Sequence, residues 1–200
     1  MGACPLRPED QLLRLFVAVD LPGQVREALA RLQGGLRSHD LSDLRWVRPQ
    51  GIHLTLKFLG ETPAGRVAAI TEALAGAIRG RRRSRLALGA LGTFGGRRRP
   101  RVLWLDITGD IEHVQELQAA VEEALVEVGF PPEERDFSPH LTLARVPQPG
   151  RPGTAERIAQ ALESVVPPRS EFDVREVVLM RSTLQPGGAV YERLAAFPLE

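Results

Sequence analysis

The sequence predicts an α+β fold, with two pseudo-symmetric lobes of mostly antiparallel sheet and flanking helices around a central cleft. Short apolar runs with strand character alternate with longer segments of helical periodicity, and a hairpin signal joins the last two runs. The tetrapeptide His-Leu-Thr-Leu occurs at 53–56 and returns at 140–143, in loosely similar places of the two halves. The 200 residues are 43% hydrophobic and 26% charged, as in a soluble globular protein.

We expect residues 1–11 to form a flexible leader and residues 12–200 to form a single bilobed domain. The leader carries prolines and acidic residues and does not resemble a secretory signal. No apolar run is long enough to span a membrane, and the lone Cys4 excludes a disulfide framework. A cytoplasmic monomer without a membrane partner is the expectation. The net charge of +1 provides no global attraction to nucleic acid.

The first half begins with a strand at 12–19, whose residues are apolar, branched or aromatic. A helix follows from about Pro22, with apolar residues recurring on one face. The remaining elements expected here are a short extended piece at 45–47, the first motif strand at 52–59, a helix at 63–78 and a strand at 86–91.

The second half follows a glycine–arginine loop at 92–101, which is too polar for regular structure. A strand is expected at 102–107, and Asp110 is expected to cap a helix that ends near Val128. The remaining elements are the second motif strand at 140–146, a helix at 154–166, and two closing strands at 172–184 and 189–197 that meet at a Gln-Pro-Gly-Gly turn.

Side chains alternate between the faces of a strand, so each motif places a histidine and a threonine together on one face. His53 and Thr55 form one such pair, and Lys57 is expected to share their face. The opposite face of that strand is expected to be buried, including Phe58. His140 and Thr142 form the second pair.

Two histidines near one cleft suit acid–base chemistry on a phosphate, because the imidazole titrates near neutral pH. One can activate a nucleophilic water and the other can protonate the leaving oxygen, while the threonine hydroxyls donate hydrogen bonds to phosphate oxygens. These arguments do not decide which histidine is the acid. A lone strand histidine is more often structural, and His39 and His113 fit that description; the repetition favours function for the other two.

A metal site is the rival use of paired histidines, since zinc sites require three or four protein ligands. No HxH, HExxH or carboxylate cluster accompanies the motifs. We therefore predict no metal and no cofactor.

The paired HxTx motifs resemble the signature of the 2H phosphoesterases. The segments RLFVAVDLP at 14–22, RWVRPQGIHLTLKFLGE at 45–61, FSPHLTLAR at 137–145 and VVLMRSTLQPGGAVYE at 177–192 are similar to those of bacterial and archaeal RNA 2′,3′-cyclic phosphodiesterases, first described as 2′-5′ RNA ligases. The resemblance implies metal-independent hydrolysis of a 2′,3′-cyclic phosphate at an RNA end to a 2′-phosphate. It also implies that His53 donates a proton to the departing 3′ oxygen, that His140 accepts the proton of the water, and that Thr55 and Thr142 hold the phosphate.

Arg145 completes a resembled HxTxxR motif, and an arginine beside a phosphate would neutralise transition-state charge. Strict alternation nevertheless places Arg145 on the face opposite His140, so this role requires a twist or a bulge before Pro147, or a side chain that wraps around the strand. The arginine runs at 81–83 and 97–101 could contact RNA backbone or be solvated surface.

Three functions remain open on these grounds. The first is a cyclic phosphodiesterase acting on RNA ends or on small cyclic nucleotides. The second is a ligase that uses the same groups with a 5′-hydroxyl in place of water. The third is a non-catalytic protein that binds RNA ends, which would not need a matched acid and base.

Overall fold

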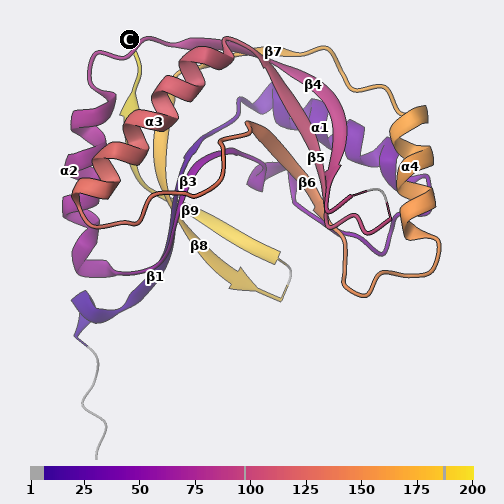
Figure 1. The fold of residues 1–200 in the computed structure, drawn as a ribbon, viewed down its shortest axis with the longest axis horizontal. Coiled ribbons are helices and arrows are strands. Elements are labelled where there is room, and N and C mark those ends of the chain that lie inside the picture. The colour runs from indigo at the N-terminus through magenta and orange to yellow at the C-terminus, as the bar shows by residue number, and fades with distance from the viewer. Residues whose placement is uncertain (1–6, 97, 187) are drawn as a thin grey trace, which may run out of the picture.

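The computed structural model describes residues 7–96, 98–186 and 188–200. It is an α+β fold in which one curled sheet of nine strands, paired antiparallel throughout, is flanked by four α-helices (Figure 1). The strands are β1 (Leu12–Val19), β2 (Arg45–Trp46), β3 (Leu54–Pro63), β4 (Ser84–Phe94), β5 (Val102–Gly109), β6 (His140–Arg145), β7 (Glu171–Val174), β8 (Glu176–Gln185) and β9 (Gly188–Pro198). The helices are α1 (Gly23–Arg37), α2 (Val67–Ile78), α3 (Ile111–Glu127) and α4 (Thr154–Ser164).

The sheet consists of two lobes that meet at the two motif strands. The strand order is β7-β4-β5-β6-β3-β1-β8-β9, and β2 is added beside β6. The junction between β6 and β3 is a single residue pair, Leu54 with Leu141. Figure 1 shows β3, β8 and β9 on one side with α2 and α3, and β4, β5 and β6 on the other with α1 and α4. The predicted architecture of two antiparallel lobes is confirmed.

Each lobe is completed by elements from the other half of the chain. The halves run β1-α1-β2-β3-α2-β4 and β5-α3-β6-α4-β7-β8-β9. The last strand of the first half, β4, pairs with β5, and β8 of the second half pairs with β1. Helix α1 likewise packs behind the second lobe, where Gln33 Nε2 donates to the carbonyl of Leu143 on β6 at 3.1 Å. Helix α3 packs on β3. This exchange ties the two lobes together.

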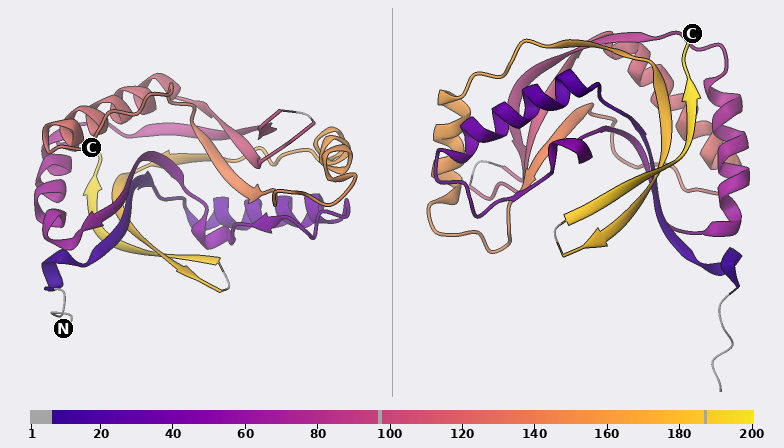
Figure 2. Two further views of the ribbon diagram at one scale, coloured as in Figure 1. Left: turned by 60° about the horizontal axis from the view of Figure 1, so that its bottom comes forward. Right: turned by 180° about the vertical axis from the view of Figure 1, so that it is seen from behind.

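The predicted strand at 172–184 is wrong in one respect, because it is two strands in different lobes. β7 pairs with β4, whereas β8, which begins two residues later, pairs with β1. Phe172, Val174 and Val177 are all buried, so the apolar pattern continues through the change of lobe. Strands β8 and β9 pair to form an arm whose far end projects from the sheet, as both Figure 1 and the reverse view in Figure 2 show.

The other predicted elements are found with shifted ends. The strand at 12–19 agrees, and the apolar stripe of α1 is fully buried. β3 continues to Pro63, so the next helix begins at Val67 rather than at 63. β4 continues to Phe94, into the predicted loop. Of the expected leader, residues 1–6 lie outside the described residues, and residues 8–10 form a 3-10 turn.

Asp110 precedes α3 as predicted, but its carboxylate does not cap that helix. It accepts a hydrogen bond from the backbone N–H of Arg85 on β4 at 2.8 Å. None of the helices that the structure describes is long and apolar enough to cross a membrane.

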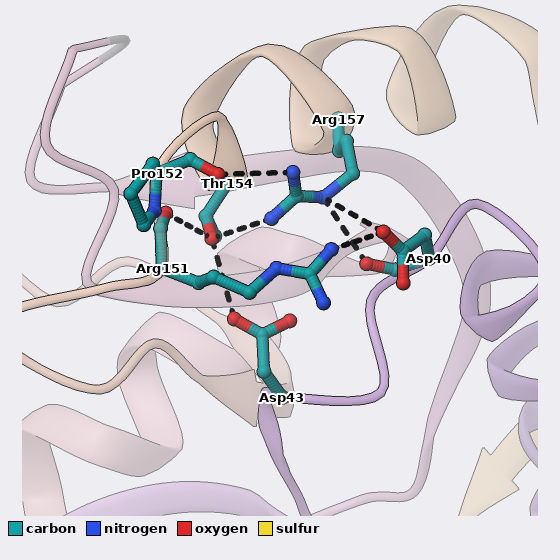
Figure 3. A network of polar contacts seen from close by, with 6 residues as sticks. All are labelled: Asp40, Asp43, Arg151, Pro152, Thr154 and Arg157. Atoms are coloured by element: carbon teal, nitrogen blue, oxygen red, sulfur yellow. Dashed lines mark hydrogen bonds and ion pairs between the residues drawn. The ribbon is translucent and has the colours of Figure 1, made fainter.

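The start of α4 is fixed to the turn that follows α1 by a polar network (Figure 3). Arg151 forms an ion pair with Asp40, and Arg157 Nε donates to the Asp40 carbonyl at 3.1 Å. Thr154 Oγ1 donates to Asp43 Oδ2 at 3.3 Å. These contacts hold the two helices of the second lobe together at its outer edge.

Candidate active site

A bulge interrupts the alternation of the first motif strand. Thr55 pairs with Ala18 and Lys57 pairs with Val17, which leaves Leu56 without a partner on β1. Leu56 and Lys57 therefore both face the core. Two expectations are wrong for this reason: Lys57 is buried, with 6% of its surface exposed, and Phe58 is 62% exposed.

The second motif strand carries a bulge at the equivalent place. Thr142 pairs with Trp104 and Ala144 pairs with Leu103, so Leu143 is the extra residue. Leu143 and Ala144 are both buried, and Arg145 is exposed. The bulge returns Arg145 to the face of His140 and Thr142, which favours the bulge among the alternatives left open by the sequence.

Parts of both motifs, and the two residues that the bulges turn to the same face, lie around one cavity of about 260 Å³ at the junction of the lobes. His53, Thr55 and Phe58 line it from β3 and the residue before it, and Thr142 and Arg145 line it from β6. Further along, its walls come from β1 and from the β8–β9 arm, through residues that include Arg14, Phe16, Ser182, Leu184 and Tyr191. No described residue that lines this cavity is acidic. The cavity therefore suits an anion.

The register of the lobe junction brings each histidine opposite the threonine of the other motif. Leu54 pairs with Leu141, so continuing the antiparallel register by one residue places Thr55 opposite His140 and Thr142 opposite His53. In a regular antiparallel ladder, the Cβ atoms of directly opposite residues lie about 5 Å apart. His140 is not itself among the cavity's lining residues; it adjoins the cavity through this register.

Both imidazoles are held by the same local contact. His53 Nδ1 lies 2.8 Å from the carbonyl oxygen of Gly51, and His140 Nδ1 lies 2.8 Å from that of Ser138. A carbonyl oxygen only accepts, so Nδ1 carries the proton in each ring. The Nε2 atom is then the position at which either ring can accept or donate a proton during a reaction.

The surroundings of the two rings differ. Phe16 stacks on His53 with ring centroids 4.6 Å apart, and Tyr191 meets it edge-on at 5.2 Å. Burial lowers the pKa of His53, while the hydrogen bond to Gly51 and the charge of Asp20 oppose that shift. His140 has Phe94 edge-on at 4.8 Å. In the free protein at neutral pH, His53 is therefore neutral.

The lowered pKa of His53 predicts that the protein loses stability on mild acidification. The unfolded chain binds a proton on this histidine near pH 6.5, whereas the folded protein binds it only at lower pH. Its contribution to the free energy of unfolding is therefore complete above pH 6.5 and is lost as the pH falls toward the folded pKa. Denaturant unfolding between pH 8 and pH 5 measures this, and His53→Gln is expected to show a smaller pH dependence than wild type. An equal slope in both proteins would contradict the assignment.

Sequence reasoning missed two cavity residues, Arg14 and Ser182. Alternation along the strand at 12–19 places Arg14 on the face of Phe16, but nothing in the sequence shows that this face reaches the motif histidines. The sequence pattern also places Phe58 in the core rather than at the cavity.

The two basic runs are not alike. In the run at 81–83, Arg81 Nε donates to Ala77 O at 2.6 Å and Arg83 Nε donates to Leu199 O at 3.2 Å. Arg98 and Arg99, by contrast, line a separate cavity of about 530 Å³ beside the start of α4; Arg97 lies outside the described residues. The first run has a structural use, and RNA contact by the second stays a prediction.

The described part of the chain holds no group of three or more His, Cys, Asp or Glu residues arranged to bind a metal ion. The donors around the motifs are two imidazoles, hydroxyls and arginines, a set that suits a phosphate better than a cation. The absence of a metal and of a cofactor from the working protein stays a prediction.

Comparison with known proteins agrees with the duplication. A sequence profile described as LigT like phosphoesterase matches the chain twice, over residues 19–104 and 105–191, and each match contains one motif. The RNA 2′,3′-cyclic phosphodiesterase of Methanothermobacter thermautotrophicus is 35% identical over 188 residues, which cover 94% of this chain and 99% of that protein. A protein of the same name from Geobacillus stearothermophilus is 37% identical over 184 residues, and the chain spans only 56% of its length.

Solved structures show the same fold. A crystal structure of a Thermus thermophilus protein has a TM-score of 0.72 at 33% identity, covering 94% of this chain and 98% of that one. The Escherichia coli LigT protein in complex with 3′-AMP has a TM-score of 0.72 at 28% identity, covering 94% and 99%. The motifs, the two profile matches and the shared fold establish that this chain belongs to the LigT-like phosphoesterase family of 2H phosphoesterases.

Proposed function

We propose that this protein hydrolyses RNA 2′,3′-cyclic phosphodiester ends to 2′-phosphomonoesters, by metal-independent general acid–base catalysis with His53 and His140. The observation that carries the proposal is the matched pair of imidazoles, each tied through Nδ1 at 2.8 Å, beside a cavity without acidic lining residues. The activity is also the one for which several relatives are named.

The two rings divide the proton transfers. His140 Nε2 accepts a proton from the water that attacks phosphorus, and His53 Nε2 donates a proton to the 3′ oxygen as its bond to phosphorus breaks. The phosphate remains on the 2′ oxygen. His53 must be protonated for this step, although burial lowers its pKa in the free protein. A bound phosphate anion favours the imidazolium and opposes that shift.

Thr55, Thr142 and Arg145 hold the phosphate. The two hydroxyls, one from each lobe, donate to the non-bridging oxygens, and the Arg145 guanidinium offsets the charge that develops in the transition state. No described residue forms an ion pair with Arg145, so its charge is available to a ligand.

The test is incubation with an oligoribonucleotide that ends in a 2′,3′-cyclic phosphate, with and without a second RNA bearing a 5′-hydroxyl. We expect a 2′-phosphate product at a rate unchanged by chelator. A joined RNA as the main product would favour the ligase, which uses the same groups in reverse, and binding without turnover would favour a non-catalytic RNA-end protein. A 3′-phosphate product would overturn the assignment of the leaving oxygen.

The Arg145→Ala variant is expected to lower kcat/KM on the cyclic substrate by about 10- to 100-fold, the range expected for a lost hydrogen bond to a charged group. Arg145→Lys keeps the charge without the paired donors and should lie between wild type and alanine. Arg31→Ala, which removes an exposed charge from α1, serves as the control. Equal rates for Arg145→Ala and Arg31→Ala would remove Arg145 from the phosphate site.

A further inference from the structure

The cavity contains a second arginine that the hydrolytic reaction described above does not use. Arg14 lies on β1, on the same face as Phe16, and it lines the cavity. Its side chain makes no ion pair or hydrogen bond with any residue in the described ranges. Glu61 is its neighbour in register on β3, yet the two form no ion pair, and Glu61 does not line the cavity. A free guanidinium thus faces an anion-binding space.

Arg14 is placed away from the cyclic phosphate. Thr55 lies beside Ala18 on β1, and Arg14 is four residues from Ala18, about 13 Å along a strand. Arg145 reaches the cavity from β6, which β3 separates from β1. The two arginines therefore reach the cavity from different strands and at different positions along the strand direction.

The space between these ends is apolar and aromatic. Phe58 is exposed, Phe16 stacks on the His53 ring, and Tyr191 meets Phe16 edge-on at 5.3 Å. Burial raises the pKa of Tyr191, and the charges of both Arg145 and Arg14 oppose that shift; all three residues line the cavity. Flat apolar walls between two cationic ends match a nucleoside that carries a phosphate on each side of its ribose.

On β8, Ser182 is the register partner of Arg14, and it also lines the cavity. Ser182 belongs to β8, in the β8–β9 arm that projects from the sheet in Figure 2. Residues of this arm, including Ser182, Leu184 and Tyr191, line the cavity together with the motif residues. A hydroxyl beside an unpaired guanidinium provides the two kinds of donor that commonly contact nucleic-acid phosphates.

We propose that Arg14 and Ser182 bind the phosphate on the 5′ oxygen of the terminal nucleotide, so that the site prefers an RNA end to a nucleoside 2′,3′-cyclic phosphate with a free 5′-hydroxyl. This inference rests on the proposed function and narrows its substrate. In an RNA chain that phosphate is the diester to the preceding nucleotide, and it is the nearest negative charge to the reacting group.

The test compares three substrates: a nucleoside 2′,3′-cyclic phosphate with a 5′-hydroxyl, the same compound with a 5′-phosphate, and a dinucleotide ending in a cyclic phosphate. In Arg14→Ala, kcat/KM is expected to fall about tenfold further for the second and third substrates than for the first. Arg14→Lys should recover part of that difference. On a longer oligonucleotide, the slope of log kcat/KM against log salt should become shallower by about 0.7, the value for one lost single-strand phosphate contact.

The matched control is Arg169→Ala, which removes an exposed arginine that is unpaired among the described residues and does not line the cavity. It should retain the wild-type preference among the three substrates. Equal losses of kcat/KM on all three substrates for Arg14→Ala would mean that Arg14 acts at the cyclic phosphate or is needed for folding. No loss on any substrate would mean that Arg14 does not contact the substrate. Either result overturns the inference.

Binding measurements separate this inference from the proposed function. Nucleoside 2′-phosphate and nucleoside 2′,5′-bisphosphate cannot react, so their binding can be measured directly. Wild type should bind the bisphosphate more tightly than the monophosphate, whereas Arg14→Ala should bind the two with similar affinity. If the wild-type protein hydrolyses none of the three substrates, the proposed function fails while the binding comparison still decides the role of Arg14.

Discussion

Replacing either His53 or His140 by alanine is expected to lower kcat/KM for cyclic phosphate hydrolysis by about 100- to 10,000-fold, the contribution of one general acid or base. The two losses should not multiply in the double variant, because both proton transfers belong to the same displacement step at phosphorus. Measurement of initial rates on an oligoribonucleotide with a 2′,3′-cyclic end tests this directly.

The chain provides two matched controls in its other histidines. His39 lies in the turn after α1, and His113 on α3 contacts Arg82 at 3.2 Å; neither lines the cavity. Alanine at these positions should leave the rate near wild type. Full activity in either His53→Ala or His140→Ala would sink the acid–base mechanism, and so would similar losses in all four variants.

The roles of the two histidines can be separated with a better leaving group. If sulfur replaces the 3′ oxygen of the cyclic phosphate, the departing thiolate needs no proton, so loss of the acid matters less. His53→Ala should then recover much of its deficit relative to wild type on the sulfur substrate, and His140→Ala should not. The opposite pattern would make His140 the acid and His53 the base, while both histidines would still carry protons in the reaction.

The alternation rule predicted the motif faces only as far as the bulges. Up to Leu56, the expected pattern agrees with the structure: Leu54 and Leu56 are buried, and Thr55 lines the cavity. Beyond that point every expectation for β3 is reversed, because a bulge adds one residue and a shift of one residue exchanges the faces. The sequence Lys-Phe-Leu at 57–59 carries no local sign of this, since one register buries Phe58 and the other buries Leu59.

The sequence could not show the pairing of the lobes for a related reason. Strand existence depends on local apolar patterns, but the exchange of β4 and β8 between lobes depends on which strands pair with each other, and an apolar pattern does not specify the pairing partner. Arg14 illustrates the consequence for the site. Its alternation with Phe16 was visible in the strand at 12–19, but only the position of β1 between β3 and β8 brings it to the cavity.

The largest effect on stability is expected from substitution of Lys57, because the bulge at Leu56 directs its side chain into the protein interior. Its ammonium forms an ion pair with Glu122 on α3 and donates to the carbonyl of Pro131 at 2.8 Å. Glu122 also accepts the backbone N–H of Glu133 at 2.8 Å. Lys57→Met is expected to lower the free energy of unfolding by about 3–5 kcal/mol, since it leaves a largely buried carboxylate without its cation.

The loss of stability in Lys57→Met should come from the unpaired Glu122 carboxylate rather than from the lost attraction between Lys57 and Glu122. A second substitution distinguishes these two causes. In Lys57→Met with Glu122→Gln, the amide oxygen still accepts the Glu133 N–H while the buried charge is gone, so most of the lost stability should return. Arg85→Met breaks the exposed pair with Glu171 and should cost about 0–1 kcal/mol. Denaturant unfolding measures all three. Because Lys57 faces α3 and not the cavity, the folded fraction of Lys57→Met should retain wild-type kcat. A fall in kcat would instead indicate that Lys57 takes part in the reaction at the phosphate site.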